Sequence, residues 1–282
     1  MALFVGIDGG GTGCRAAVAD ASGRVLGEGC AGPANIASDL AAALGNILAA
    51  TSMALAAAVG PGKVAQTLPT LAAGLGLAGA NAAGVEDRLR AGLPFARVRV
   101  ETDAIAAVRG ALRDHDGIVA ALGTGSVFAR QQAGVIRQIG GWGLVLGDDG
   151  SGAWLGREVL RMVLRAAEGF CPQTPFLRQI SAEHGGTGGV IAFSLSARPA
   201  DLAALVPAIL LADDPAILAL LDKATADVAE SIAVLQPDPS LPVTFIGGLG
   251  PTYAARLADR WPIAAAQGTA LDGALLLARG AA

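Results

Sequence analysis

The sequence predicts an α/β protein made of two similar halves, each a mixed β-sheet covered by helices. Apolar strand-like segments alternate with helix-like segments, which is the pattern of a sheet covered on both faces. A strand, glycine turn, strand pattern occurs twice, with Thr12 and Thr124 at equivalent places, 124 − 12 = 112 residues apart. The 282 residues also exceed a typical domain of roughly 100–150. We therefore expect one lobe at residues 1–115 plus 268–282 and the other at 116–267.

The first half opens as a β-meander. Strands are expected at Leu3–Asp8, Cys14–Asp20 and Arg24–Gly29, with turn residues at both corners. A long helix should begin near Ser38 or Asp39, which offer N-cap oxygens, and end at Gly60-Pro61-Gly62. The remaining elements expected in this half are strand Thr70–Leu77, helix Asn81–Ala91, strand Arg97–Glu101 and helix Asp103–Arg113.

The second half repeats the meander and then becomes helical. Strands are expected at Ile118–Leu122, Ser126–Gln131 and Val135–Ile139, and the turn glycines Gly123 and Gly125 match Gly11 and Gly13. The further elements expected are helices Gly152–Glu168, Pro175–Glu183, Thr187–Leu195, Pro199–Ala212 and Pro215–Leu235, strand Val243–Ile246 and helix Ala270–Arg279.

Charge and cysteine content exclude several classes of protein. Twenty basic residues stand against 24 acidic ones, for a net charge of −4 without a basic run, so no nucleic-acid partner is expected. Three cysteines without Cys-x-x-Cys spacing suggest neither disulfides nor a zinc or iron–sulfur site. Cys14 and Cys30 are expected to be buried as small apolar residues. His115 and His184 lack partner spacing and are assigned to surface or structural positions.

No membrane association is expected. The N-terminus lacks a basic segment, a long apolar core and a cleavage signature, so a cytoplasmic location is predicted. The apolar stretch 40–59 has the length of a membrane span, but Asn46, Thr51 and Ser52 interrupt it and alanine contributes little transfer energy. We expect it to be a buried helix.

Two glycine turns carry the chemistry that the sequence indicates. Asp8 precedes Gly9-Gly10-Gly11-Thr12-Gly13, so a carboxylate adjoins backbone N–H groups that no Cβ obstructs. Such a nest binds phosphate, and the carboxylate can hold Mg²⁺ through water. An ordinary hairpin would use similar residues, but the second turn at 123–125 favours phosphate binding. A P-loop is excluded because neither lysine follows the required glycine loop, and a Rossmann site because the turn leads into a strand.

These motifs together resemble the actin, hexokinase and heat-shock-chaperone ATPase superfamily. Within it, the sequence is similar almost end to end to the N-acetylglucosamine and glucosamine kinases grouped with the BadF/BadG/BcrA/BcrD-type ATPases. The resemblance implies two actin-like, ribonuclease H-like lobes with an ATP cleft between them. The segments that carry it are Asp8-Gly9-Gly10-Gly11-Thr12, Gly32-Pro33-Ala34-Asn35, Asp103-Ala104, Gly123-Thr124-Gly125, Gly140-Gly141-Trp142-Gly143, Gly147-Asp148-Asp149-Gly150-Ser151 and Gly247-Gly248.

The resemblance also implies a role for each site residue. Asp103 would be the general base, although an Asp between a strand and a helix also suits a plain N-cap. Asp148 would bind the sugar and Asp149, rather than Ser151, would cap the following helix, an assignment that the motif leaves open. The other implied ligands are Asp8 for Mg²⁺; Gly10, Gly11, Thr12, Gly13, Gly123, Thr124 and Gly125 for the ATP phosphates; Gly247 and Gly248 for adenosine; and Asn35, Asp103 and Trp142, with Asp148, for the sugar.

The expected reaction is transfer of the γ-phosphoryl group of Mg-ATP to the 6-hydroxyl of glucosamine or N-acetylglucosamine, with N-acetylmuramic acid as another acceptor. The resemblance also suggests a homodimer, and the small-residue helices 104–110 and 270–278 are expected to cross as a hinge. The main alternative is an ATPase activator of an acyl-CoA dehydratase or reductase, which the cysteine positions disfavour. A chaperone would need a peptide-binding domain, and a repressor a helix-turn-helix segment ahead of the first strand.

Overall fold

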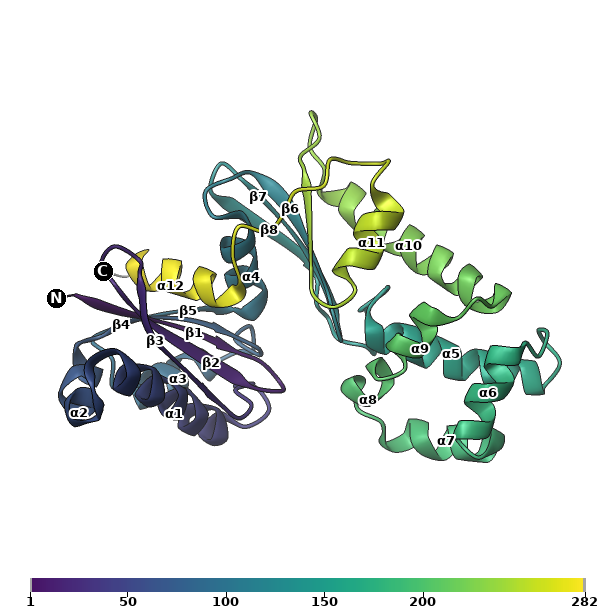
Figure 1. Cartoon of the computed structure of the whole chain (residues 1–282), viewed down its shortest axis with the longest axis horizontal. Helices are drawn as coiled ribbons and strands as arrows, with labels where there is room; N and C mark the ends of the chain where they lie inside the picture. Colours follow the sequence, from purple (N-terminus) through teal and green to yellow (C-terminus); the bar gives the residue numbers. More distant parts are fainter. Residues whose placement is uncertain (1, 281–282) are drawn as a thin grey trace. The chain divides into compact units, whose positions relative to one another are not determined.

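The computed structural model describes residues 2–280 and divides into two compact units. Unit 1 comprises the chain up to Asp116, the hairpin tip Gln131–Ile136 and the segment from Ala265 onward. Unit 2 comprises Gly117–Arg130 and Arg137–Ala264. Each unit is built on one β-sheet flanked by helices (Figure 1), which confirms the predicted α/β class with two mixed sheets.

Unit 1 contains a five-stranded sheet in the order β3-β2-β1-β4-β5. The first three strands form the predicted antiparallel meander, while β4 and β5 run parallel to β1. The carboxyl ends of β1, β4 and β5 therefore lie at one edge of the sheet. The strands are β1 (Leu3–Gly9), β2 (Cys14–Asp20), β3 (Val25–Ala31), β4 (Ala72–Leu77) and β5 (Arg97–Thr102).

Helix α1 (Leu40–Val59) covers one face of this sheet, with its N-terminus capped by Asp39. It packs closely on β3, where a Cβ on Gly27 or Gly29 would collide with the backbone of Ala54 or Ala50. The helix has the length and apolar composition of a membrane span, yet 33% of its most apolar window is buried inside unit 1. The expectation of a buried helix holds in part. The face toward the sheet is buried, whereas other side chains, such as Met53, are exposed. Around it lie η1 (Pro61–Lys63), α2 (Val64–Thr67), η2 (Leu68–Thr70) and α3 (Val85–Gly92).

Helices α4 (Asp103–Leu112) and α12 (Ala270–Gly280) cover the opposite face of the sheet and cross each other. A Cβ on Gly110 would collide with the carbonyl oxygen of Thr269, and one on Gly273 with that of Ala106. The two helices touch backbone to backbone, as the small residues at 104–110 and 270–278 predict. Both helices belong to unit 1.

The crossing of α4 and α12 should not tolerate one added methyl group. We expect Gly273→Ala to lower the free energy of unfolding by about 1–3 kcal/mol, because the helices must separate to admit the side chain. Gly45 in α1 is also helical but has open space above it. Gly45→Ala should instead raise the free energy of unfolding by about 0.5–1 kcal/mol, because alanine has the higher helix propensity. Urea unfolding of both variants measures the two signs, and equal effects would contradict the close crossing.

Unit 2 contains a four-stranded sheet in the order β8-β7-β6-β9. This order repeats β3-β2-β1-β4 of the first sheet strand for strand, and β6 pairs in parallel with β9 as β1 does with β4. The duplication inferred from the two glycine turns is thus visible in the strand order. The strands are β6 (Gly117–Leu122), β7 (Ser126–Gln132), β8 (Val135–Gly140) and β9 (Val243–Ile246).

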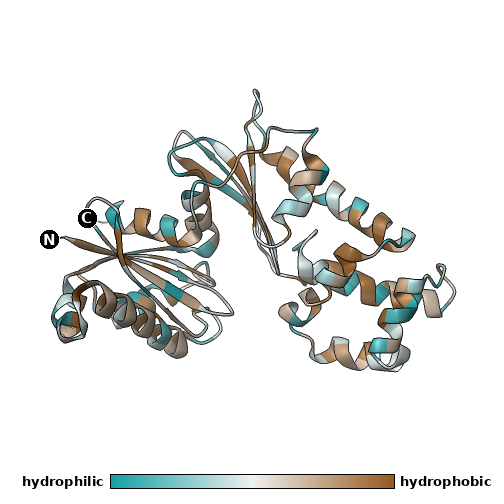
Figure 2. Cartoon of the chain, in the orientation of Figure 1, coloured by the Kyte–Doolittle hydropathy of each residue, from teal (hydrophilic) through white to brown (hydrophobic). Residues whose placement is uncertain are grey.

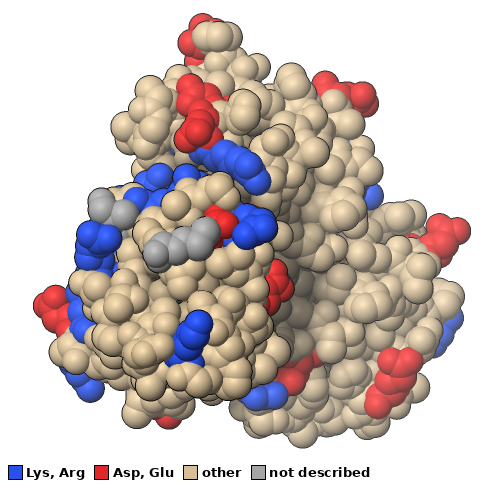
Figure 3. All heavy atoms as spheres, turned by 60° about the vertical axis from the view of Figure 1, so that its left-hand side comes forward, with Lys and Arg blue, Asp and Glu red and all other residues tan. Residues whose placement is uncertain are grey.

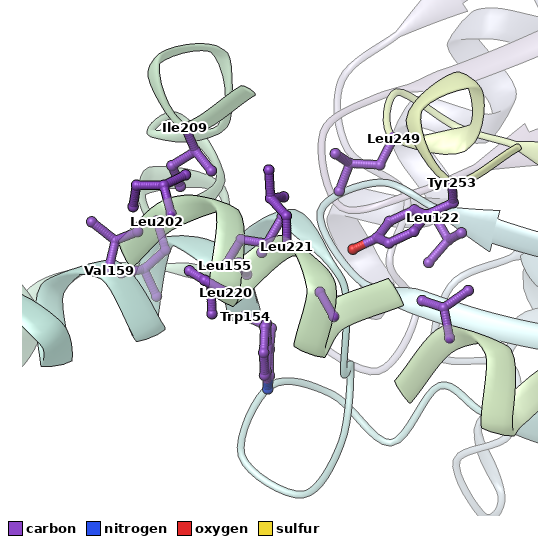
Figure 4. Close-up of a cluster of buried hydrophobic side chains, with 14 of the residues drawn as sticks. Leu122, Trp154, Leu155, Val159, Leu202, Ile209, Leu220, Leu221, Leu249 and Tyr253 are labelled. Atoms are coloured by element: carbon purple, nitrogen blue, oxygen red, sulfur yellow. The ribbon is translucent and has the colours of Figure 1, made fainter. Parts of the chain in front are cut away.

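A single large apolar core joins the helices of unit 2 to its sheet. Figure 4 shows Trp154 and Leu155 of α5 packed with Leu220 and Leu221 of α10, next to Leu122. Strands and inner helix faces are mostly hydrophobic in Figure 2. The helices are α5 (Gly152–Ala167), α6 (Pro175–Glu183), α7 (Gly186–Ser196), α8 (Pro199–Ala203), α9 (Val206–Leu211), α10 (Pro215–Leu235) and α11 (Gly250–Leu257).

Two predicted helices differ from the structure, and the short helix α2 was not expected. The helix expected at 199–212 is two short helices, α8 and α9, because Pro207 starts a new first turn. The helix expected from Asn81 begins at Val85, after Gly84 in a left-handed conformation. Helix α11 was not expected at all.

Charged side chains are sparse and stand in small groups on the face drawn in Figure 3.

Candidate functional site

The parallel strands of unit 1 bring three acidic residues toward one edge of the sheet. Asp8 on β1 is in register with Gly76 on β4, which in turn is in register with Glu101 on β5. Asp103 follows β5 directly and begins α4. The carboxyl edge of a parallel sheet is where α/β proteins bind ligands. The structure therefore places Asp8 and Asp103 at a suitable edge of the same unit.

Asp8 makes an ion pair across the β1–β2 hairpin. The Arg15 guanidinium lies 2.6 Å from Oδ2 of Asp8, and the two residues are directly paired in the ladder. The Asp8 side chain is 16% exposed and that of Arg15 is 61% exposed. The carboxylate is thus held in place at the edge of the sheet while the arginine remains largely in solvent.

The turn after Asp8 is closed by a hydrogen bond from Gly10 N–H to the Gly13 carbonyl oxygen at 2.9 Å. Gly10 and Gly11 have no positive φ, and a Cβ on either would meet nothing within 4 Å. Neither the backbone conformation nor packing therefore requires glycine at these two positions. Open space above a bare backbone is what a closely approaching ligand needs. Thr12 is exposed beside it.

Asp103 occupies the first turn of α4 but is not its cap. Thr102 is the N-cap, and its side chain accepts a hydrogen bond from the Ile105 N–H. Asp103 Oδ1 accepts from the Ala104 N–H at 2.9 Å. Burial raises the pKa of Asp103, and the negative charge of Asp8 adds to the effect. A plain capping role is thus taken by Thr102, and Asp103 is a partly buried acid with a raised pKa near a second carboxylate, which is typical of functional sites.

Asn35 lies in the loop between β3 and α1 of the same unit. Its Oδ1 accepts hydrogen bonds from the N–H groups of Ala37 and Ser38, at 3.0 and 3.2 Å. These two bonds engage the side-chain oxygen of Asn35. The amide N–H₂ group is what this side chain can offer to a ligand.

In unit 2, the Gly123–Gly125 turn is tied to the start of α5. The Gly123 N–H donates to the Gly125 carbonyl oxygen, and the N–H groups of Gly152 and Ala153 donate to the carbonyl oxygens of Gly123 and Thr124. A Cβ on Gly123 would meet nothing within 4 Å, and Thr124 is exposed. This turn shares with Gly10–Gly13 a bare backbone that faces open space.

Asp148 braces this turn from the loop that precedes α5. It has φ +62°. Burial is the main cause that raises the pKa of Asp148, and the nearby backbone N–H groups of Ser126 and Gly143 oppose this shift. The carboxylate lies beside the turn at Gly125. Trp142, from the same loop, is 71% exposed.

The expectation that Asp149 caps α5 is wrong. Ser151 is the N-cap, fully buried, with its hydroxyl accepting from the Trp154 N–H at 3.2 Å. Ser suits this position because its short side chain reaches the N3 amide without leaving the core. Asp149 is exposed and lines a cavity of about 390 Å³ with Lys223 and Asp227.

The two glycines after β9 differ in what they do. Gly247 has φ +86°, and a Cβ on it would collide with the Leu122 carbonyl oxygen, so the fold itself requires glycine. Gly248 is exposed with nothing within 4 Å. Only Gly248 therefore leaves backbone free for a ligand to approach.

The isolated cysteines and histidines take structural or surface positions. Cys14 is buried, and desolvation raises the pKa of its thiol to about 12. The expected burial of Cys30 is wrong, because it lies on the edge strand β3 and is exposed. His115 contacts the Leu112 carbonyl oxygen through Nδ1, and His184 that of Ile180.

Sequence reasoning missed Arg15 and Thr102, and it ranked Ser151 behind Asp149 as the cap of α5. A signal for the first was present: Asp8 and Arg15 are equidistant from a four-residue turn, so a hairpin closing at Gly9 and Cys14 must pair them. Both caps are a Ser or Thr directly before the helix, whose hydroxyl accepts from the N–H group three residues further on. This residue type at this place is the signal that sequence reasoning could have used.

The chain matches several known proteins over most of its length. A glucosamine kinase of Vibrio cholerae is 31% identical over 291 aligned residues, covering 99% of this chain and 96% of the relative. An N-acetylmuramic acid/N-acetylglucosamine kinase of Clostridium acetobutylicum is 31% identical over 172 residues, covering 59% of this chain and 55% of that relative.

Solved structures give the same picture. One from Chromobacterium violaceum, described as a candidate N-acetylglucosamine kinase, superposes with a TM-score of 0.87 at 32% identity, covering 99% of each chain. A ROK family glucokinase from Streptomyces griseus, at 19% identity and a TM-score of 0.54 over 99% of each chain, shares the fold. The model of the BadF/BadG/BcrA/BcrD ATPase family matches residues 5–250. The chain therefore belongs to the BadF/BadG/BcrA/BcrD ATPase family.

Proposed function

We propose that this protein is an ATP-dependent amino-sugar kinase that phosphorylates the 6-hydroxyl of glucosamine or N-acetylglucosamine. The observation that carries the proposal is Asp103, a partly buried carboxyl group with a raised pKa, next to Asp8 at the carboxyl edge of the unit 1 sheet. Family membership and two relatives named as amino-sugar kinases support it.

Asp103 acts as the general base in this proposal. Its Oδ1 is occupied by the Ala104 N–H, which leaves Oδ2 to accept the proton of the sugar hydroxyl. The hydroxyl oxygen forms a bond to the γ-phosphorus, the bond from that phosphorus to the β–γ bridging oxygen breaks, and ADP leaves with the electron pair. Since phosphoryl transfer depends chiefly on positioning and on charge stabilisation, the base is one contribution among several.

The residues present suit a nucleotide and its metal ion. Gly10, Gly11 and Gly123 have backbones that face open space, which suits close approach of phosphate oxygens. The proposal assigns phosphates to the turns at 10–13 and 123–125, including Thr12 and Thr124, and the adenosine to the turn at 247–248. The carboxylate of Asp8, which is 16% exposed and pairs with Arg15 through Oδ2, would hold Mg²⁺ through water; bound there, the ion would neutralise charge on the phosphates.

Besides Asp103, the proposal assigns three side chains to the sugar: Asn35, Asp148 and Trp142. Asn35 donates through its amide N–H₂ group, because its oxygen is engaged. The carboxylate of Asp148 lies beside the turn at Gly125, and its oxygens can accept from sugar hydroxyls. Trp142 exposes an apolar ring that suits the face of a pyranose. An acceptor rich in hydroxyl groups matches this set.

An ADP-release assay across a panel of sugars tests the proposed reaction. We expect glucosamine or N-acetylglucosamine to raise ATP turnover at least about a hundredfold over the sugar-free rate, because water is a poorly positioned acceptor. Glucose and N-acetylmuramic acid serve as comparison acceptors, and NMR of the product identifies the phosphorylated hydroxyl. The kinase proposal fails if no sugar in the panel stimulates turnover.

The proposal also includes a cytoplasmic location and a homodimer. Sedimentation at micromolar concentration decides the oligomeric state, and a monomer throughout would reject the dimer.

A further inference from the structure

The loop that carries Trp142 and Asp148 contains three glycines in the left-handed region. Gly140, Gly141 and Gly143 have φ values of +72°, +74° and +80°. Glycine backbone has many accessible conformations, because it lacks the Cβ that restricts other residues. Trp142 stands between two of these glycines and is 71% exposed, so its own packing does little to hold it. A contact from outside the loop is therefore needed to keep these side chains in one place.

The base of this loop is tied to Ser126, the first residue of β7. The Ser126 carbonyl oxygen accepts from the Gly141 N–H at 3.1 Å, and the Ser126 hydroxyl donates to the Asp149 carbonyl oxygen at 3.0 Å. Ser126 is 5% exposed, so these bonds are shielded from water. The residues between, 142–147, form a turn of their own on the Gly143 carbonyl oxygen. Both ends of the loop are thus held, while the part between them needs a further contact.

Arg157 on α5 supplies that contact. Its Nη1 donates to the Leu144 carbonyl oxygen at 2.8 Å, which is the distance of a good hydrogen bond. In the part of the chain that the structure describes, this is the one hydrogen bond that joins residues 142–147 to a helix. Helical side chains lean toward the N-terminus of their helix. A long side chain in the second turn of α5 therefore reaches back to the loop that precedes the helix.

Glu158 orients the guanidinium of Arg157. Its Oε1 accepts from Nε of Arg157 at 3.4 Å, and its Oε2 accepts from Nη1 of Arg161 at 3.2 Å. The Glu158 side chain is only 17% exposed. Arg161 shares this carboxylate but, among the described residues, makes no hydrogen bond to the loop. Because the guanidinium is a rigid plane, fixing its Nε also fixes the direction in which Nη1 points at the loop.

We propose that Arg157 is a positioning residue for the sugar: its bond to Leu144 holds the loop in the conformation in which Trp142 and Asp148 meet the acceptor. The inference rests on the proposed function, which assigns these two side chains to the sugar, and it adds a residue that acts through the loop. A loop that is already held does not have to be ordered during binding, so the sugar binds more tightly. The loop contacts the sugar before and during the reaction alike, so Arg157 should set the KM for the sugar rather than kcat.

Arg157→Met tests the hydrogen bond, because methionine keeps an apolar stem and removes every donor. We expect the KM for the accepted amino sugar to rise by about tenfold while kcat changes by less than about twofold. The dissociation constant of Mg-ADP, measured by calorimetry, should stay within about twofold, since the turns assigned to the nucleotide lie outside the loop. Arg157→Lys retains a donor on a flexible stem and should recover most of the sugar affinity.

Arg161→Met is the matched control, because Arg161 lies on the same helix and pairs with the same Glu158. Its KM for the sugar should equal that of the wild type. Hydrogen exchange gives a readout that needs neither sugar nor turnover: the amides of residues 142–147 should exchange faster in Arg157→Met than in the wild type or Arg161→Met. Loss of a merely structural arginine would lower the Tm of both variants alike and would leave the loop amides and the sugar KM unchanged.

The outcomes separate this inference from the function on which it rests. If Arg157→Met keeps the wild-type KM for the sugar, or its loop amides exchange at the wild-type rate, the positioning role is overturned while the kinase proposal stands. A rise in the sugar KM that is matched by weaker Mg-ADP binding, or by Arg161→Met, would also overturn it, because the effect would then be general. If no sugar stimulates ATP turnover by the wild type, the proposed function fails and the role of Arg157 fails with it.

Discussion

Asp103→Asn should reduce sugar-dependent phosphoryl transfer by about 10²–10⁴-fold, the usual contribution of a positioned general base. The amide keeps the shape of the side chain and can still accept from the Ala104 N–H, so sugar affinity should change little. Initial rates of ADP release, with sugar binding measured separately by calorimetry, check both parts. Unchanged turnover would place the base elsewhere.

The wild-type rate should also fall on the acidic side at a higher pH than an ordinary aspartate would cause. Burial raises the pKa of Asp103, so its carboxylate is protonated, and inactive as a base, at pH values where exposed aspartates remain charged. The pH profile of kcat/KM reports this pKa in the free enzyme. A profile that is flat down to the usual range of aspartate would contradict the assignment.

The same raised pKa predicts that the inactive variant is the more stable one. Between the pKa of unfolded aspartate and the raised pKa of folded Asp103, the folded state binds more protons, so stability falls as pH rises through this window. Above it the folded protein carries a buried charge at a cost. Asp103→Asn removes that cost and should raise the Tm at pH 7.5.

Asp201 is the control with the opposite sign. Hydrogen bonds from Arg198 lower the pKa of Asp201, so its stabilising effect is present at neutral pH and is lost as pH falls through the lowered pKa. Asp201→Asn should therefore lower the Tm at pH 7.5, slightly, because this pair is exposed. Thermal scans of the two variants at pH 7.5 and 4 compare them. A lower Tm for Asp103→Asn would mean that its charge stabilises the fold.

Helices and strands whose ends carry capping or turn residues could be predicted from the local sequence. Helix α10 spans Pro215–Leu235 as predicted, because Asp214 caps it and Pro215 suits the first turn. The two meanders followed from glycine turns between apolar runs, and their repetition predicted the shared strand order of the two sheets. Helix α11 was missed although Pro251 stands in its first turn, since the preceding glycines pointed to a turn only.

The site was harder to predict because its details depend on contacts between distant segments. The pKa of Asp103 depends on burial and on Asp8, which a parallel pairing through β4 brings near. The pKa of Asp148 depends on burial and on nearby amides of Ser126 and Gly143, and its left-handed backbone has no signature in an Asp-Asp pair. The sequence likewise could not separate Gly247, which the Leu122 carbonyl requires, from Gly248, which nothing in its surroundings constrains.

Gly11→Val should abolish nucleotide binding while leaving the fold intact. A side chain at Gly11 meets no protein atom within 4 Å, and its φ is not positive, so stability should change by no more than about 0.5 kcal/mol. The valine would instead fill the space over the backbone in which the phosphates are proposed to lie. We expect the affinity for Mg-ADP, measured by calorimetry, to fall at least about a hundredfold.

Gly62→Val separates this effect from the general cost of a β-branched residue in a glycine turn. Gly62 is exposed, lacks positive φ and has open space above it, but lies in η1, away from the glycine turn. It should bind Mg-ADP like the wild type. Gly9→Val supplies the opposite case, since its Cβ would press on Leu77 and Ala34 and should destabilise the fold. If Gly11→Val binds nucleotide as well as Gly62→Val does, the open space above the turn is not a phosphate site, and the proposed kinase loses its ATP contacts in unit 1.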